Sequence, residues 1–136
     1  MSLIGHALKM AKFYYDENTF NHAIRVTTYV AENPLIPVDI MDNCIALAIM
    51  HDLLEDTKYP REDNLLGQYF VNCLNLLTKE KGEDYIKYID MIKTYANEYP
   101  EAYWVKIADM KDHLSQTNTL TDKLKNKYLA ALAHLL

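Results

Sequence analysis

Ala48-Ile49-Met50-His51-Asp52-Leu53-Leu54-Glu55-Asp56-Thr57 is the stretch that decides the fold of this 136-residue chain. Its first residues belong to a longer segment, 37–51, that begins with Pro37 and is apolar on nearly every side. Such a segment is typical of a helix buried at the centre of a bundle. This helix then ends in four ionisable side chains, at positions 51, 52, 55 and 56. Burying them unpaired would cost several kcal/mol each, so the stretch predicts a buried helix together with a group that offsets its charges.

A divalent cation is the group that would offset these charges. On a helix, residues four apart share a face, so we expect His51 to lie over Glu55 and Asp52 over Asp56. An imidazole and a carboxylate are ordinary metal ligands, which makes His51 and Asp52 candidate ligands. Glu55 and Asp56 are then within reach of a water on the ion, and they are the candidate catalytic pair.

Two further ligands must come from elsewhere, because two adjacent residues cannot fill a coordination sphere. His22 lies near the start of an amphipathic helix for which Thr19 offers the cap. Asp109 follows the largely apolar run Val105-Lys106-Ile107-Ala108, where an aspartate is otherwise unexpected. The sequence therefore predicts one cation held by four side chains on converging helices: His22, His51, Asp52 and Asp109.

The rest of the chain also shows helical spacing of its apolar residues. Glycine occurs three times and proline four times, so helix breakers are scarce. The pattern predicts an all-α bundle of about seven helices in a single domain, 1–136. The expected helices cover residues 3–15, 19–33, 37–51, 61–77, 83–97, 100–114 and 121–136, with Gly82 as the C-terminal cap of the fourth, Pro100 opening the sixth and Thr121 opening the last.

Composition limits the partners of this chain. A net charge of −5 leaves no basic surface for a phosphate backbone, so nucleic acid is not expected. A small anionic substrate remains open, because a bound cation reverses the local sign of a site. No apolar run approaches the ~18–20 residues that cross a bilayer, so no membrane partner is expected. Cys44 and Cys73 stand singly and no signal peptide is evident, which favours reduced core thiols in a cytoplasmic protein.

The ordered set His22, His51-Asp52 and Asp109 resembles the H…HD…D signature of the HD superfamily of metal-dependent phosphohydrolases. Residues 48–57 and Val105-Lys106-Ile107-Ala108-Asp109 are similar to the "LHDxxEDT" and "VKLAD" motifs of the hydrolase domain in RelA/SpoT-type alarmone enzymes. Leu76-Leu77-Thr78-Lys79 is similar to the "LT" segment of that family. The resemblance extends from about Ala7 to Leu114, so a synthetase domain has no room and a stand-alone hydrolase is expected.

This resemblance implies an HD-domain helical bundle that hydrolyses the 3′-pyrophosphate of guanosine tetra- or pentaphosphate, a small-molecule nucleotide. It implies a single Mn²⁺ on the four ligands, with Glu55 and Asp56 as the catalytic acidic pair. Two imidazoles with two carboxylates suit Mn²⁺ or Fe²⁺, and the donor set leaves Co²⁺, Zn²⁺ and Mg²⁺ open.

The chain departs from the family in the region that recognises the base. Residues 14–22 lack the basic, arginine-containing segment that precedes the first histidine of the family. His113 replaces the asparagine four residues after the last aspartate, and it shares a helical face with Asp109. His113, Lys106 and Arg25 are the candidate substrate-binding residues. The alternatives are a solvated lysine for Lys106 and a surface ion pair for Arg25.

Two other functions remain open at this level. One is an HD nucleotidase or phosphodiesterase that acts on another nucleotide. The other is a non-catalytic HD module that senses a nucleotide. Degenerate modules usually lose ligands or the acidic pair, and this chain keeps all six groups, which favours an enzyme. His6 and His134 lack neighbours of this kind and are expected at the surface or boundary without a function, and the oligomeric state, including a homodimer, stays open.

Overall fold

The apolar segment at the centre of the sequence forms the central helix of the computed structural model, which describes residues 2–61, 63 and 65–136. In α3 (Met41–Met50), six of the ten residues are buried, which confirms the expected core helix. The other elements are α1 (Leu3–Tyr14), α2 (Glu17–Glu32), the 3-10 turn η1 (Val38–Ile40), α4 (Leu53–Asp56), α5 (Gln68–Leu76), α6 (Tyr85–Thr94), α7 (Pro100–Ser115) and α8 (Asp122–Leu135).

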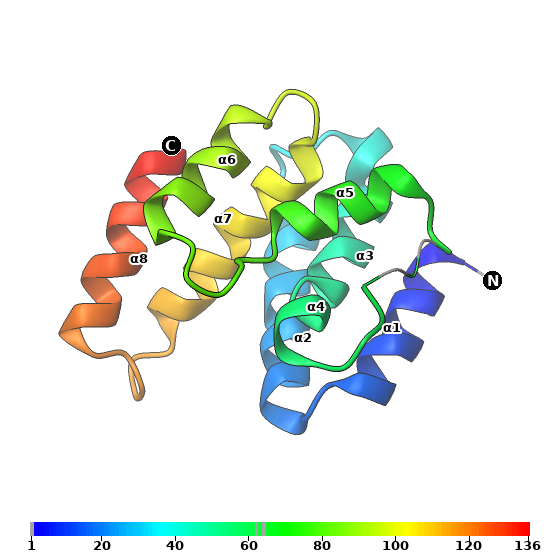
Figure 1. Cartoon of the computed structure of the whole chain (residues 1–136), viewed down its shortest axis with the longest axis horizontal. Helices are drawn as coiled ribbons and strands as arrows, with labels where there is room; N and C mark the ends of the chain where they lie inside the picture. The colour runs from blue at the N-terminus through cyan, green and yellow to red at the C-terminus, as the bar shows by residue number, and fades with distance from the viewer. Residues whose placement is uncertain (1, 62, 64) are drawn as a thin grey trace.

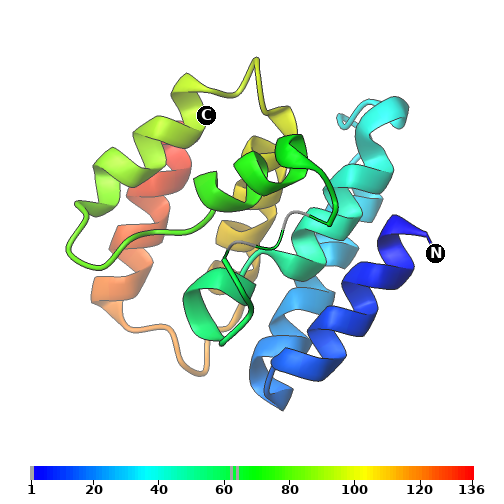
Figure 2. The ribbon, with the colours of Figure 1, turned by 45° about the vertical axis from the view of Figure 1, so that its right-hand side comes forward.

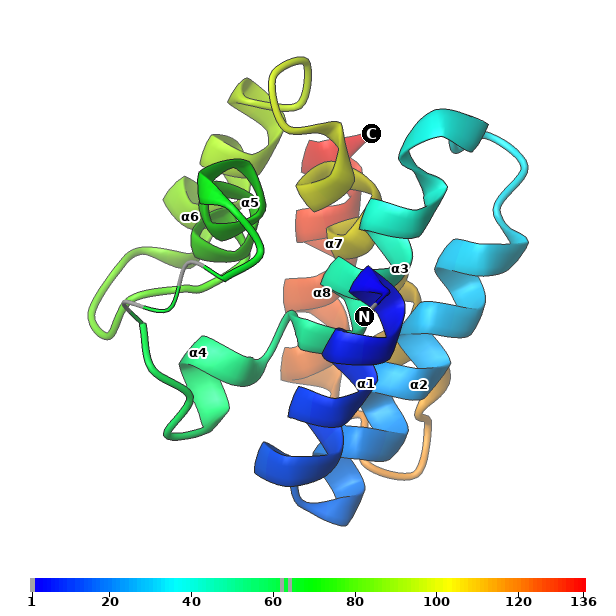
Figure 3. The same ribbon diagram turned by 90° about the vertical axis from the view of Figure 1, so that its right-hand side faces the viewer.

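The helices pack around α3 and α7. Helices α1 and α2 each pack against α3 (Figures 1 and 3). Helix α7 packs against α2 and α3 with one side and against α8 with another, and α6 covers α8. Helix α5 crosses the region between α3 and α7, as Figures 1 and 2 show. The central position of α3 and α7 brings the two predicted motifs, at 48–57 and 105–109, into contact.

The expected all-α fold is confirmed. No strand occurs in the part of the chain that the structure describes. Apart from α4, a single turn of four residues, every α-helix spans nine residues or more. Within the described ranges, no helix has both the length and the hydropathy needed to span a bilayer.

Capping side chains set several helix boundaries. The Asp16 carboxylate accepts a hydrogen bond from the Thr19 main-chain N–H at 2.8 Å, so α2 begins at Glu17. The expectation that Thr19 caps this helix was therefore wrong, and His22 lies in its second turn. Pro100 does open α7, and the Thr121 hydroxyl caps α8 at the Leu124 N–H, as expected.

The described residues just before α5, 61, 63 and 65–67, are not helical, although helical spacing predicted a helix over 61–77. Helix α5 begins only at Gln68, because Gly67 has a φ of 92° and interrupts any regular helix there. Asp63 also accepts a hydrogen bond from the Leu65 N–H at 3.1 Å, a local contact that competes with helix formation. Positions 62 and 64, which the prediction covered, lie outside the described residues. Helix α5 ends at Leu76, so Gly82 does not cap it.

The central helix is interrupted at its functional end. Pro37 precedes the 3-10 turn η1, α3 starts at Met41, and α3 stops at Met50. His51 and Asp52 form a turn before α4, with ψ of 1° at Asp52. The expectation of one helix through this stretch was therefore wrong, although the Asp56 N–H still donates to the Asp52 carbonyl oxygen, one helical turn away, at 2.9 Å.

The burial of the two cysteines and of His6 can be compared with the expectations from the sequence. Cys44 and Cys73 are buried free thiols, as expected. His6 lies at the boundary of the core, one of the two places expected for it, with 8% of its surface exposed, because α1 packs on α3 with its His6 side inward.

Candidate metal centre and its pocket

The structure brings the four predicted ligands together from three places in the fold. His22 comes from α2, His51 and Asp52 come from the turn between α3 and α4, and Asp109 comes from α7. The Oδ1 atom of Asp109 lies 2.9 Å from His22 Nε2 and 3.4 Å from His51 Nε2. The Oδ2 atom of Asp52 lies 3.2 Å from His51 Nε2 and 3.6 Å from His22 Nε2.

These distances suit ligands of one cation. Ligand atoms about 2.1 Å from an ion, at angles of about 90–110°, are about 3.0–3.4 Å apart. His22, His51 and Asp52 each place a ligand atom within 4.8 Å of the others, and so do His22, Asp109 and His113. The Nε2 atom of His51 is also buried without a hydrogen-bond partner among the described residues. A buried nitrogen left without a partner beside two carboxylates is what a metal ion would satisfy.

Both histidines are oriented through their other ring nitrogen. His51 Nδ1 donates to the Ala48 carbonyl oxygen at 2.6 Å, and His22 Nδ1 donates to Asp112 Oδ2 at 2.6 Å. Since a neutral imidazole carries one proton, these bonds leave the Nε2 lone pairs directed at Asp52 and Asp109.

The carboxylates attract protons to the histidines when no ion is bound. Burial alone would lower the pKa of His51, but the carboxylates of Asp52 and Asp109 raise it to about 9. Burial would likewise lower the pKa of His22, and the Asp109 carboxylate raises it. A cation that binds here therefore competes with protons.

Asp112 is a functional candidate that sequence reasoning missed. It is fully buried, and besides His22 it accepts two hydrogen bonds from Arg25, from Nε at 2.8 Å and from Nη2 at 3.1 Å. Arg25, predicted to bind substrate, is thus held on the opposite side of His22 from the other ligands. Two signals were available: Asp112 follows Asp109 by three residues and Arg25 follows His22 by three, so each pair shares a helical face.

Lys106 is buried and not the solvated lysine considered as its alternative. Its Nζ lies 2.9 Å from Asp109 Oδ2 and 4.9 Å from the centroid of the Tyr88 ring. Burial alone would lower the pKa of Lys106, but the Asp109 carboxylate raises it well above its usual value. Burial would raise the pKa of Asp109, yet Lys106 and the neighbouring histidines hold it well below its usual range. Asp109 is therefore ionised, and the ionised carboxylate is the form that can bind a cation.

His113 lies one turn after Asp109 on α7, as the sequence predicted. Its Nε2 is 3.2 Å from Asp109 Oδ1, and its ring stacks on Tyr128 of α8 at 4.6 Å between centroids. It stands at the edge of the ligand cluster, beside the cavity.

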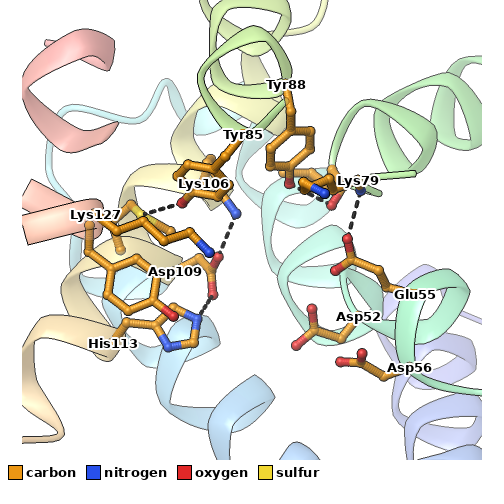
Figure 4. Close-up of a pocket in the computed structure, with 13 residues that line it drawn as sticks. Asp52, Glu55, Asp56, Lys79, Tyr85, Tyr88, Lys106, Asp109, His113 and Lys127 are labelled. Carbon is orange, nitrogen blue, oxygen red and sulfur yellow. Dashed lines mark hydrogen bonds and ion pairs between the residues drawn. The ribbon is translucent and has the colours of Figure 1, made fainter. Parts of the chain in front are cut away.

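A cavity of about 250 Å³ opens beside the cluster (Figure 4). It is lined by both predicted catalytic acids, by three lysines and by three tyrosines: Asp52, Glu55, Asp56, Leu77, Lys79, Tyr85, Tyr88, Lys106, Asp109, Met110, His113, Lys127 and Tyr128. Glu55 Oε1 accepts a hydrogen bond from the Lys79 main-chain N–H at 2.7 Å. Burial raises the pKa of Glu55, and burial together with the Asp52 charge raises the pKa of Asp56.

Tyr15 is a second residue that sequence reasoning missed in this role. Its hydroxyl donates to the Ile49 carbonyl oxygen at 2.8 Å and accepts from the Asp52 N–H at 3.2 Å. It therefore fixes the turn that carries two of the candidate ligands, through contacts that no local pattern reveals.

The fold and the cluster define an all-α helical bundle with two histidines and two aspartates gathered at its centre. The chain matches no protein-family model and no curated protein. Among solved structures it is similar to one described as "A metazoan ortholog of SpoT hydrolyzes ppGpp and plays a role in starvation responses". The TM-score is 0.71 at 20% identity, over 99% of this chain and 84% of that one. The likeness confirms the fold expected from the HD resemblance.

Proposed function

We propose that this chain is a metal-dependent phosphohydrolase that releases pyrophosphate from guanosine 3′,5′-bis(diphosphate). The observation that carries the proposal is that Asp52 and Asp109, beside two oriented histidines, share one cavity with Glu55 and Asp56. The similarity in fold to a protein described as hydrolysing ppGpp supports the choice of substrate.

His22, His51, Asp52 and Asp109 would hold the ion. Mn²⁺ is our first choice, and Fe²⁺, Co²⁺, Zn²⁺ and Mg²⁺ are the alternatives to compare. When bound, a divalent cation polarises a phosphoryl oxygen and makes a nearby water more acidic.

The residues of the chain then have separable tasks. The carboxylate of Glu55 or Asp56 accepts the proton of the attacking water, and the raised pKa of each makes it a better proton acceptor near neutral pH. Lys106 keeps Asp109 ionised, and with His113 it lines the wall against which the substrate would lie. Arg25 acts through Asp112, which orients His22.

One sequence observation favours a second candidate, an HD nucleotidase with another substrate. Residues 14–22 contain no arginine or lysine that could stack on a guanine base. A panel of guanosine polyphosphates, deoxynucleoside monophosphates and cyclic nucleotides, assayed with each metal, separates the two. Pyrophosphate release from the guanosine compound supports the proposal, and turnover of deoxynucleoside monophosphates alone selects the second candidate.

Variants identify the site within the same experiment. His51→Ala and Asp109→Ala should each abolish turnover and bound metal together. His134→Ala is the matched control, because the His134 side chain pairs with Asp90 on the surface, at 3.0 Å, and does not line the cavity, so it should leave both unchanged. A chain that binds metal and nucleotide but turns over none of the panel would be a sensing module, and the enzymatic proposal would be rejected.

A further inference from the structure

Three imidazoles converge on one carboxylate oxygen of the cluster, Asp109 Oδ1. Their Nε2 atoms lie 2.9 Å from it for His22, 3.2 Å for His113 and 3.4 Å for His51. The rings come from α2, from α7 and from the turn after α3, so separate parts of the fold direct them to the same atom. Two of these histidines are predicted metal ligands, and His113 is not.

Hydrogen bonds do not account for this convergence. One carboxylate oxygen offers about two acceptor positions, fewer than the ring nitrogens that surround it. The other oxygen of Asp109 accepts a hydrogen bond from Lys106 Nζ at 2.9 Å. The Nε2 atom of His51 is left without a hydrogen-bond partner among the described residues. A cation between the rings and the carboxylate would contact all of these atoms at once, which hydrogen bonds to one oxygen cannot do.

Packing holds the ring of His113 in its orientation. The ring stacks on Tyr128 of α8, with the centroids 4.6 Å apart and an angle of 12° between the planes. Its centroid also lies 4.8 Å from the centroid of the His22 ring. Figure 4 shows a ring nitrogen of His113 directed at the Asp109 carboxylate. Stacking thus orients this imidazole toward the cluster, as the hydrogen bonds at Nδ1 orient the other two.

The spacing of the atoms suits one ion. Asp109 Oδ1 lies 2.9 Å from His22 Nε2 and 3.2 Å from His113 Nε2. Neighbouring ligand atoms about 2.1 Å from an ion are about 3.0–3.4 Å apart. His22, Asp109 and His113 also each place a possible ligand atom within 4.8 Å of the other two. These distances put His113 within reach of the ion that His22 and Asp109 would hold.

We propose that His113 is a fifth ligand of the metal ion, in addition to His22, His51, Asp52 and Asp109. The inference deepens the proposed function and rests on its metal site, and it takes the place of the substrate-binding role predicted for His113 from the sequence. A six-coordinate ion with five protein ligands keeps one position for water or substrate. A third imidazole also favours Co²⁺ over Mn²⁺ more than an amide at this position would.

Pulsed electron paramagnetic resonance counts the imidazoles on the ion without any turnover. The full chain, labelled with ¹⁵N-histidine and loaded with Mn²⁺ alone, should show three coordinated imidazoles. The His113→Asn variant, prepared in the same way, should show two. Two imidazoles in the parent protein would overturn the proposal, and that result does not depend on whether the variant folds.

His134→Asn is the matched control for the affinity of the site. His134 lies 3.0 Å from Asp90 and its side chain is 38% exposed, close to the 3.2 Å and 36% found for His113. In calorimetric titration, we expect His113→Asn to lower the affinity for Mn²⁺ about tenfold or more, and the affinity for Co²⁺ by a larger factor. His134→Asn should leave both affinities unchanged, because His134 is outside the ligand cluster.

The remaining outcomes separate this inference from its alternatives. A higher KM for nucleotide with unchanged metal affinity in His113→Asn would make His113 a substrate contact and overturn the proposal. Three imidazoles on the ion in a chain that hydrolyses none of the nucleotides would support the fifth ligand and reject the proposed enzyme. Hydrolysis with only two imidazoles on the ion would do the reverse. Thermal melting of both variants without metal checks that each is folded.

Discussion

Replacement of Asp112 tests the proposed metal centre through a residue that is not itself one of the proposed metal ligands. Asp112 is completely buried and accepts hydrogen bonds from His22 Nδ1 at 2.6 Å and from Arg25 at 2.8 and 3.1 Å. In Asp112→Ala the imidazole of His22 loses the acceptor that keeps its proton on Nδ1. The ring is then free to rotate or to place the proton on Nε2, the atom that faces Asp109.

The expected magnitudes follow from these contacts. Loss of a hydrogen-bond partner behind a metal-binding histidine typically costs about 10–100-fold in metal affinity, or about 1.4–2.7 kcal/mol. Hydrogen bonds to charged groups contribute about 1.5–3 kcal/mol each to stability. The Arg25 side chain is 42% exposed and regains water when released, so we expect the metal-free protein to lose about 2–3 kcal/mol, mainly through His22. Asp112→Asn keeps an oxygen for His22 but turns an amide toward Arg25, and its metal affinity should fall less.

Two measurements separate the effects. Calorimetric titration of Mn²⁺ gives the affinity, and urea denaturation of the metal-free protein gives the free energy of unfolding. Asp90→Ala is the control, because it removes another aspartate from a histidine, His134, at an exposed site. If Asp112→Ala binds Mn²⁺ as tightly as the parent protein while it remains folded, the argument that this carboxylate orients His22 is refuted.

Further predictions concern the effect of pH, the turn between α3 and α4, and the backbone at Gly67. Folding raises the pKa of Glu55, so this residue contributes stability below its unfolded pKa, and that stability is lost as pH rises through the folded pKa. The Tm of the metal-free Glu55→Gln variant should therefore rise relative to the Tm of the parent protein as pH increases. A Tm difference that stays constant across a pH series would contradict this. Since the carboxylates raise the pKa of His51 to about 9, Mn²⁺ affinity measured by calorimetry should increase with pH up to that value. Tyr15→Phe removes both hydrogen bonds to the turn and should lower the free energy of unfolding in urea by about 1–3 kcal/mol. Gly67→Ala, at φ 92° with open space for a Cβ, should lower it by about 1 kcal/mol through backbone strain alone, and an unchanged midpoint would exclude that cost.

The elements that local sequence determines were predictable. The buried core helix α3, the start of α7 at Pro100 and the Thr121 cap of α8 follow from the spacing of apolar residues and from short-range hydrogen bonding, and each is present in the structure. The convergence of α2, α3 and α7 was also expected, because buried ionisable residues on separate helices need common partners. His22, His51 and Asp109 do meet at contact distance.

The parts that sequence did not predict depend on contacts across the fold. Helical spacing continues through 61–67, but the positive φ of Gly67 breaks the helix at that residue, just before α5. The break after Met50 is held by Tyr15, 34 residues away from its Ile49 partner. Asp112 on α7 gains its hydrogen-bond partners only when α2 packs against α7. A periodic pattern shows which face of a helix is buried, and it does not show which polar residue on that face finds a partner.

The break between α3 and α4 explains how four neighbouring ionisable residues serve two purposes. In one uninterrupted helix, Asp52 and Asp56 would lie on one face and His51 and Glu55 on the next, with all four confined to one helix side. The turn instead buries His51 against the Ala48 carbonyl while α4 leads Glu55 away to the Lys79 N–H, 2.7 Å distant (Figure 4). Glu55 thereby ties the segment after α5 to the proposed metal centre. Asp52, Glu55 and Asp56 thereby line one cavity together with Asp109 from α7.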